Sequence, residues 1–163
     1  MRKPADPTPK PSAFSKALGL AARREPSARD LKRKLAQDGY ARDETDAALE
    51  RLQSLDFQND VRFAGVLIRS RAGQGHGPRR VMAELRGHGL DEAAVRARLE
   101  EEDIDWAGIA RRLYRRRFGG RPPADRVETA RRAAFLLRRG FDAATVRSLT
   151  HADDVDDSSD DFD

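Results

Sequence analysis

The feature of this sequence best suited to chemistry is a concentration of arginine between residues 103 and 150. Twelve arginines stand there among only five acidic residues. Arg111 with Arg115, and Arg112 with Arg116, are spaced four residues apart, so like charges would repel one another along a helix face. A polyanion would offset that repulsion, because guanidinium groups bind phosphate and carboxylate through paired hydrogen bonds. The pattern favours a surface for nucleic acid or nucleoprotein, with an ordinary solvated face as the alternative.

A second basic pair, Arg79-Arg80, is expected in the first turn of a helix, where the helix dipole favours anions. The glycine-rich stretch 73–77 before it lacks the Gly-Lys-Ser/Thr ending of a phosphate-binding loop, and no strand precedes it, so we interpret it as a connector. The predicted residues for binding a partner or DNA are Arg79, Arg80, Arg111, Arg112, Arg115, Arg116, Arg117, Arg131, Arg132, Arg138 and Arg139.

Other kinds of site find little support in the sequence. The chain has no cysteine, and its three histidines lack the spacing of metal ligands. His76 and His88 adjoin glycines at segment ends, where we expect them to be exposed. No sequence pattern predicts a pocket around an acidic pair or a nucleophile–base arrangement that could serve catalysis. We therefore predict a protein that is not an enzyme and uses no metal or cofactor.

The composition also bears on where the protein acts. A chain without cysteine fits a reducing compartment. No stretch is apolar enough to cross a bilayer, and the basic, proline-rich start lacks the apolar core of a signal peptide. We therefore expect a cytoplasmic protein with no membrane partner.

Charge is distributed unevenly along the chain. Residues 151–163 contain seven aspartates and no Lys or Arg, and the remaining 150 residues hold 32 basic against 21 acidic side chains, a net charge of +11. Segments 1–11 and 151–163 are predicted to be disordered. The acidic tail is either a solubilising end or an internal mimic of a polyanion that shields the arginines. In the second case, deleting residues 152–163 would raise the affinity for DNA at low salt.

Between these ends the sequence repeats with a period of about 50 residues. Each copy has an apolar residue, a Gly four positions later, a second apolar residue directly after, and then another short apolar-periodic segment. The residues that carry the pattern are Leu35, Gly39 and Tyr40, then Leu85, Gly89 and Leu90, then Leu136, Gly140 and Phe141. A glycine in this position ends a helix in the left-handed conformation. Asp91 and Asp142 follow as N-caps of the next helices.

The repeat predicts an all-α protein of three tandem three-helix repeats, stacked as an elongated, curved array. We expect helices at 12–22, 27–38, 43–54, 59–71, 78–87, 91–101, 103–117, 123–138 and 142–149. The predicted repeats cover residues 12–57, 58–102 and 103–150. Aromatic residues recur at matching positions and are interpreted as core: Phe14, Phe63, Trp106, Phe135 and Phe141.

These motifs resemble those of the RecX family of RecA regulators. The stretch 135–141, Phe-Leu-Leu-Arg-Arg-Gly-Phe, is similar to a segment of the family's third unit. Residues 60–95 resemble its middle signature, and residues 31–40 its opening one, so that the resemblance covers about residues 13–149. One departure is visible at residues 56–60, Asp-Phe-Gln-Asn-Asp, where the family usually has a glycine. Aspartate tolerates the left-handed conformation, so the turn is expected to survive.

The resemblance implies a regulatory protein that binds RecA or its filament on single-stranded DNA and inhibits ATP hydrolysis and recombination. It also implies a part in DNA repair and the SOS response. A protein that binds DNA or RNA generally, without RecA, is the alternative that the arginines alone support. Single- and double-stranded DNA are further candidate partners, and we expect the chain to be a monomer.

Overall fold

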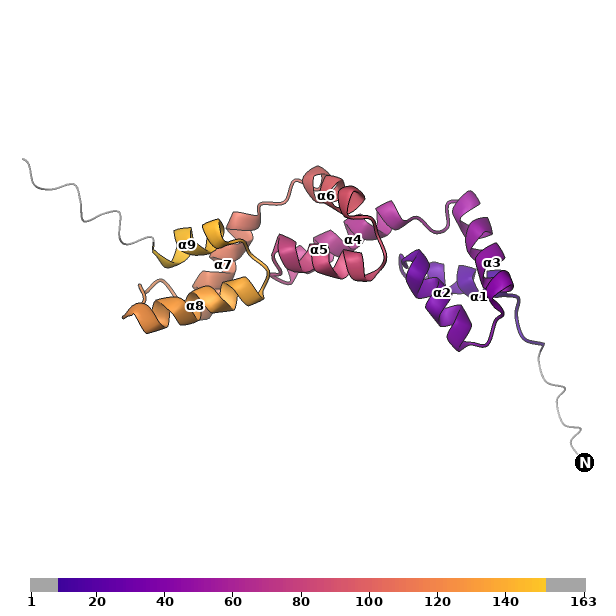
Figure 1. The fold of residues 1–163 in the computed structure, drawn as a ribbon, viewed down its shortest axis with the longest axis horizontal. Helices are drawn as coiled ribbons and strands as arrows, with labels where there is room; N and C mark the ends of the chain where they lie inside the picture. The colour runs from indigo at the N-terminus through magenta and orange to yellow at the C-terminus, as the bar shows by residue number, and fades with distance from the viewer. Residues whose placement is uncertain (1–8, 152–163) are drawn as a thin grey trace, which may run out of the picture. The chain divides into compact units, whose positions relative to one another are not determined.

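A computed structural model describes residues 9–151, and within that range the chain forms helices and no strand (Figure 1). This confirms the predicted all-α class and the three sets of three helices. The helices are α1 (Ala13–Ala21), α2 (Ala28–Gln37), α3 (Arg42–Ser54), α4 (Asp60–Gly73), α5 (Pro78–Gly87), α6 (Glu92–Glu101), α7 (Trp106–Phe118), α8 (Arg126–Arg138) and α9 (Ala143–Thr150). We call α1–α3, α4–α6 and α7–α9 the first, second and third modules.

The chain divides into two compact units that meet between Phe63 and Ala64, inside α4. In the first unit, Leu31, Leu35 and Leu52 are fully enclosed among α1, α2 and α3. In the second unit, the core of the third module is built on Leu136 and Phe141. Each helix is too short to be stable by itself, so this burial, rather than helix propensity, holds each unit together.

The predicted glycine turns are present in all three modules. Gly39, Gly89 and Gly140 have φ angles of 79°, 83° and 94°. After each glycine the next amide folds back onto the helix: Tyr40 N–H donates to the Leu35 carbonyl (3.1 Å), and Phe141 N–H to the Leu136 carbonyl (3.2 Å). This is the Schellman arrangement, in which the residue after the glycine returns its side chain to the helix that has just ended.

Two aspartates occupy the left-handed region at comparable turns. Asp56, at the departure from the family pattern, has φ 56°, and Asp103, which follows α6, has φ 46°. The predicted tolerance of the turn at residue 56 is therefore confirmed. The turn at Asp103 also explains why α7 begins at Trp106 and not at residue 103: Asp105 is its N-cap, and its carboxylate accepts the Gly108 N–H (2.8 Å).

The repeated aromatic residues lie in the cores to differing degrees. Phe63 and Phe141 are buried, whereas Phe14, Trp106 and Phe135 are half-buried. Phe118 adds a ring that was not predicted, and it packs edge-on against Phe135 with centroids 5.4 Å apart. Edge-to-face packing of this kind stabilises a core beyond the area that it buries.

An ion pair between α4 and α5 fastens the second module. The Arg71 guanidinium donates two hydrogen bonds to the Glu84 carboxylate (2.6 and 2.8 Å), and this contact holds the pKa of Glu84 below its usual range. A carboxylate whose pKa is lowered by folding stabilises the fold at neutral pH and loses that contribution as the pH falls through the lowered pKa.

Glu84→Gln is therefore expected to cost about 1 kcal/mol of unfolding free energy at pH 7, a value discounted for partial solvent exposure. The difference from the parent protein should be smaller at pH 3 than at pH 7, because protonation of the Glu84 carboxylate progressively removes its ion pair with Arg71 as the pH falls through the lowered pKa. Urea unfolding at the two pH values measures this, with the exposed Glu50→Gln as control. An equal loss of unfolding free energy at both pH values would show that the stabilisation does not come from the ionised Glu84 carboxylate.

Candidate polyanion-binding surface

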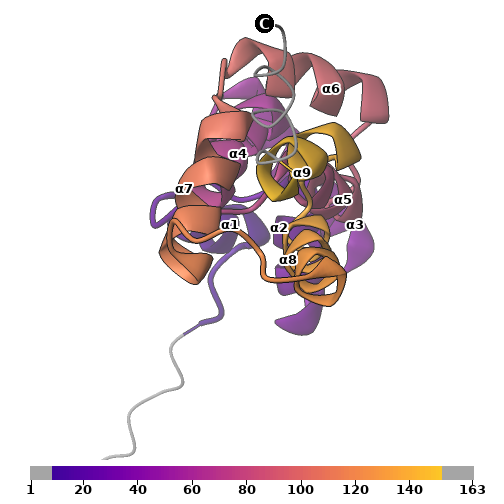
Figure 2. The ribbon, with the colours of Figure 1, turned by 90° about the vertical axis from the view of Figure 1, so that its left-hand side faces the viewer.

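Helix α7 has an apolar inner face and a basic outer face. Ala110, Leu113 and Tyr114 are buried in the core of the third module. The helical period turns the residues between them outward. The arginines that the structure exposes on α7 are Arg111, Arg112, Arg115, Arg116 and Arg117. Figure 2 shows α7 to the left of α8 and α9.

These arginines lack partners of opposite charge. In the part of the chain that the structure describes, none of the five makes an ion pair, and Arg132–Glu128 is the pair that the third module forms. The second module differs, because Arg69, Arg71 and Arg98 pair with Glu102, Glu84 and Glu102 respectively. A cation without a counter-charge keeps its full capacity to bind an external anion.

The reason for this imbalance lies in how the third module uses its acidic residues. Asp105, Asp125 and Asp142 are N-caps of α7, α8 and α9, and each carboxylate accepts a backbone N–H of the helix that it begins. Glu128 accepts from the Ala124 N–H and from Arg132, which together hold its pKa below the usual range. The carboxylates that could neutralise the surface are thus used to start helices and to pair Arg132.

Helix α8 and the turn after it add further basic residues to this module. Arg131 and Arg138 are exposed, and Arg139 is half-buried with its guanidinium 5.7 Å from the Phe135 ring centre. Arg132 is different: it is only 4% exposed and donates to Glu128, to the Tyr114 hydroxyl (3.0 Å) and to the Arg121 carbonyl (2.8 Å). The prediction that Arg132 binds a partner is corrected, because its donors are used inside the fold.

Arg132→Met is accordingly expected to destabilise the third module, because Glu128 and the Tyr114 hydroxyl lose their shared partner. The melting temperature should fall by roughly 5–10 °C. The neighbouring Arg131→Met removes the same charge from an exposed site and should leave the melting temperature nearly unchanged. Differential scanning calorimetry distinguishes the two, and equal shifts would show that the buried contacts add nothing.

A backbone contact brings two distant basic pairs together. The Gly77 N–H donates to the Arg139 carbonyl (2.8 Å), and the Arg79 N–H donates to the Gly140 carbonyl (3.1 Å). The two loops approach so closely that a Cβ at residue 140 would lie 2.5 Å from the Cβ of Arg80. Arg79 and Arg80, at the start of α5, therefore stand beside Arg138 and Arg139, at the end of α8. We call these four arginines the junction cluster.

His76 lies within this positive environment. Burial lowers its pKa, and the nearby charges of Arg80, Arg139 and Arg71 lower it further. The prediction that His76 and His88 are exposed is wrong, since both side chains are half-buried. The His76 imidazole, with its lowered pKa, adds no charge to the four arginines of the junction cluster at neutral pH. Within the described residues none of these four arginines makes an ion pair.

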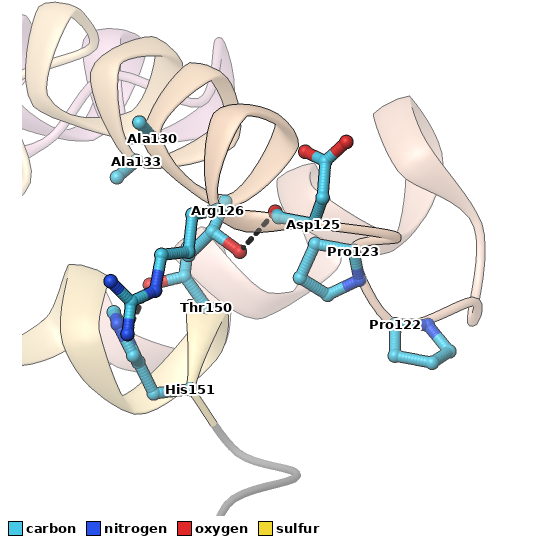
Figure 3. Close-up of a pocket in the computed structure, with 9 residues that line it drawn as sticks. Pro122, Pro123, Asp125, Arg126, Ala130, Ala133, Thr150 and His151 are labelled. Atoms are coloured by element: carbon cyan, nitrogen blue, oxygen red, sulfur yellow. Dashed lines mark hydrogen bonds between the residues drawn. The ribbon is translucent and has the colours of Figure 1, made fainter.

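Two hollows lie beside the proline pair that leads into α8. One, of about 740 Å³, is lined by Pro122, Pro123, Arg126, Thr129 and His151 among others. In Figure 3 the Arg126 side chain extends toward His151, and the Asp125 carboxylate points away from both. The other hollow, of about 390 Å³, shares the two prolines and is lined by Arg111, Arg115 and Arg121.

Among residues 9–151, no group of three or more His, Cys, Asp or Glu side chains is placed to hold a metal ion. Over the same residues, none of the helices has the length and apolar character needed to cross a membrane.

Comparison with known proteins assigns each module to a described domain. Residues 13–52, 59–99 and 105–149 match the first, second and third three-helix domains of RecX. A regulatory protein RecX of Xanthomonas citri is 44% identical over 138 residues, which is 85% of each chain. The RecX of Stenotrophomonas maltophilia strain K279a is 43% identical over 155 residues, covering 95% of this chain and 93% of that protein.

Solved structures agree on the fold. A crystal structure of regulatory protein RecX covers 86% of this chain and 70% of its own, with a TM-score of 0.72 and 20% identity. The crystal structure of RecX from Lactobacillus salivarius covers 87% of this chain and 94% of its own, with a TM-score of 0.72 and 18% identity. With three matching domains in order and close relatives over nearly the whole length, the chain belongs to the RecX family.

Proposed function

We propose that this protein binds the RecA filament on single-stranded DNA and lowers its ATP hydrolysis and recombination activity. The contact is made by the exposed arginines of α7 and α8 and by the junction cluster. The observation that carries the proposal is that these cations make no ion pair in the described structure and, apart from the half-buried Arg139, are exposed. Arg69, Arg71 and Arg98 of the second module are instead neutralised by Glu84 and Glu102.

Membership of the RecX family narrows the expected partner from any polyanion to a nucleoprotein. The relatives are named regulatory proteins RecX, and the resemblance to that family implies RecA as the partner. A filament offers both phosphates and protein carboxylates, and arginine binds either in bidentate fashion. Several adjacent contacts on one filament strengthen one another through effective concentration. The role is regulatory and non-catalytic, and since the filament forms on the chromosome, it is exerted in the cytoplasm.

The test is RecA ATP hydrolysis on single-stranded DNA at fixed RecA and DNA concentrations, titrated with this protein. We expect hydrolysis to fall at ratios well below one molecule per RecA protomer, because binding at one point on a filament affects its neighbours. Binding to the same DNA without RecA is measured in parallel by fluorescence anisotropy over a salt series.

The two measurements separate this proposal from the alternative of a general nucleic-acid-binding protein. Unchanged hydrolysis at a two-fold excess over RecA, together with strong salt-dependent binding to naked DNA, would support that alternative. Inhibition that disappears when the DNA is made abundant would point the same way, since the protein would then act by competing for DNA.

A further inference from the structure

The two hollows beside Pro122 and Pro123 lie where helix α9 ends. Ser148 and Leu149 line the smaller hollow, and Thr150 and His151 line the larger one. The last turn of α9 is therefore a wall of both. Pro122 and Pro123 line both hollows, and we call the two hollows together the proline groove.

The charge of the proline groove is almost wholly positive. Arg111, Arg115 and Arg121 line one part, and Arg126 lines the other beside His151. The acidic residue in the lining is Asp125, whose carboxylate already accepts the Glu128 N–H (2.7 Å) as the cap of α8. None of the four lining arginines forms an ion pair within residues 9–151. The groove thus fits a ligand with several carboxylates or phosphates.

The sequence supplies such a ligand at the edge of the groove. His151 lines the larger hollow, and the next twelve residues contain seven aspartates, beginning with Asp153. Two residues of extended chain span at most about 7 Å. Because Asp153 follows the groove residue His151 by two positions, the covalent chain gives the aspartates an effective concentration in the millimolar range at the groove.

We propose that residues 152–163 bind in the proline groove as an intramolecular ligand and compete with polyanions for Arg111, Arg115 and their neighbours. The binding itself needs neither RecA nor nucleic acid, whereas its regulatory consequence rests on the proposed function. Net charge alone would also make the acidic segment weaken DNA binding. A direct measurement of its position is therefore needed.

The absence of cysteine allows a single nitroxide spin label to be attached to the full chain at Ser159→Cys. Paramagnetic broadening of amide signals is then read at the groove residues Gly119, Gly120, Thr129 and Ala130. The matched control carries the same label with all seven aspartates of residues 152–163 changed to Asn, so that chain length and tether are preserved. We expect broadening rates at least three-fold greater with the native aspartates, and a loss of that excess at 0.5 M salt, where charges are screened within a few ångströms.

Equal broadening in the native and neutralised chains would overturn the proposal. A second arm adds a fifteen-residue oligo-dT to the labelled native chain. Displacement of the segment as the oligonucleotide binds supports competition, and unchanged broadening at saturation overturns it. Because RecA is in neither arm, failure of the RecA titration would refute the proposed function without affecting this result.

Discussion

Changing Arg111, Arg112, Arg115 and Arg116 together to serine is expected to weaken binding to the RecA–single-stranded DNA filament by about 100-fold. The four side chains are exposed and make no ion pair in the described structure, so the fold should not change. The expected effect comes from losing contacts with phosphate or carboxylate. If single-stranded DNA is touched directly, the slope of log affinity against log salt should fall by roughly 3 for four lost phosphate contacts.

A matched control separates this site from net charge. Arg23→Ser with Arg24→Ser removes two exposed arginines of the first module, which likewise have no ion pair in the described range. The comparison is with Arg112→Ser plus Arg116→Ser, a change of the same charge on α7. We expect the control to change the concentration for half-inhibition of RecA hydrolysis by less than about three-fold. Equal losses for the two pairs would show that overall charge, and not α7, governs binding.

Gly140→Ala is expected to destabilise the second compact unit by about 2–4 kcal/mol. At φ 94° a side chain is strained, and the new Cβ would lie 2.5 Å from the Arg80 Cβ and 2.6 Å from the Arg80 backbone nitrogen. Because these are the Cβ and the backbone nitrogen of Arg80, no side-chain rotation relieves the contacts, and the two loops must move apart. That separation breaks the hydrogen bonds between residues 77–79 and 139–140.

The control for this change is Gly120→Ala, whose Cβ would meet nothing within 4 Å. Urea unfolding followed by circular dichroism should show a loss for Gly140→Ala and little change for Gly120→Ala. RecA inhibition should weaken in the first variant at temperatures where it is still folded, because the junction cluster is no longer assembled. Normal stability for Gly140→Ala would mean that the loops are not locked together in solution.

Features governed by local sequence could be predicted to within a few residues. The glycine turns after α2, α5 and α8, and the caps Asp91 and Asp142, follow from residue types at short range. Helix α8 begins three residues later than the predicted residue 123. Proline is tolerated at the start of a helix, but Asp125 offers a carboxylate that caps the first turn, and the helix therefore begins at Arg126.

The candidate site was only partly predictable, because its shape depends on contacts between distant residues. Arg131 and Arg132 are equivalent in composition, yet one is exposed and the other buried. A signal did exist: Arg132 precedes the buried Leu136 by four residues and thus shares its inward face. No local sequence pattern predicts the contact between Gly77 and Gly140. The junction cluster could therefore not be predicted from the sequence.

The contact between Gly77 and Gly140 also constrains how the chain is made. During synthesis, the amide groups of Gly77 and Arg79 emerge some sixty residues before the carbonyls that accept from them. The start of α5 therefore remains incomplete until α8 and its turn have left the ribosome. Since a loop of this length costs entropy before its contacts form, its closure is a late step. We therefore expect the second and third modules to complete their folding together.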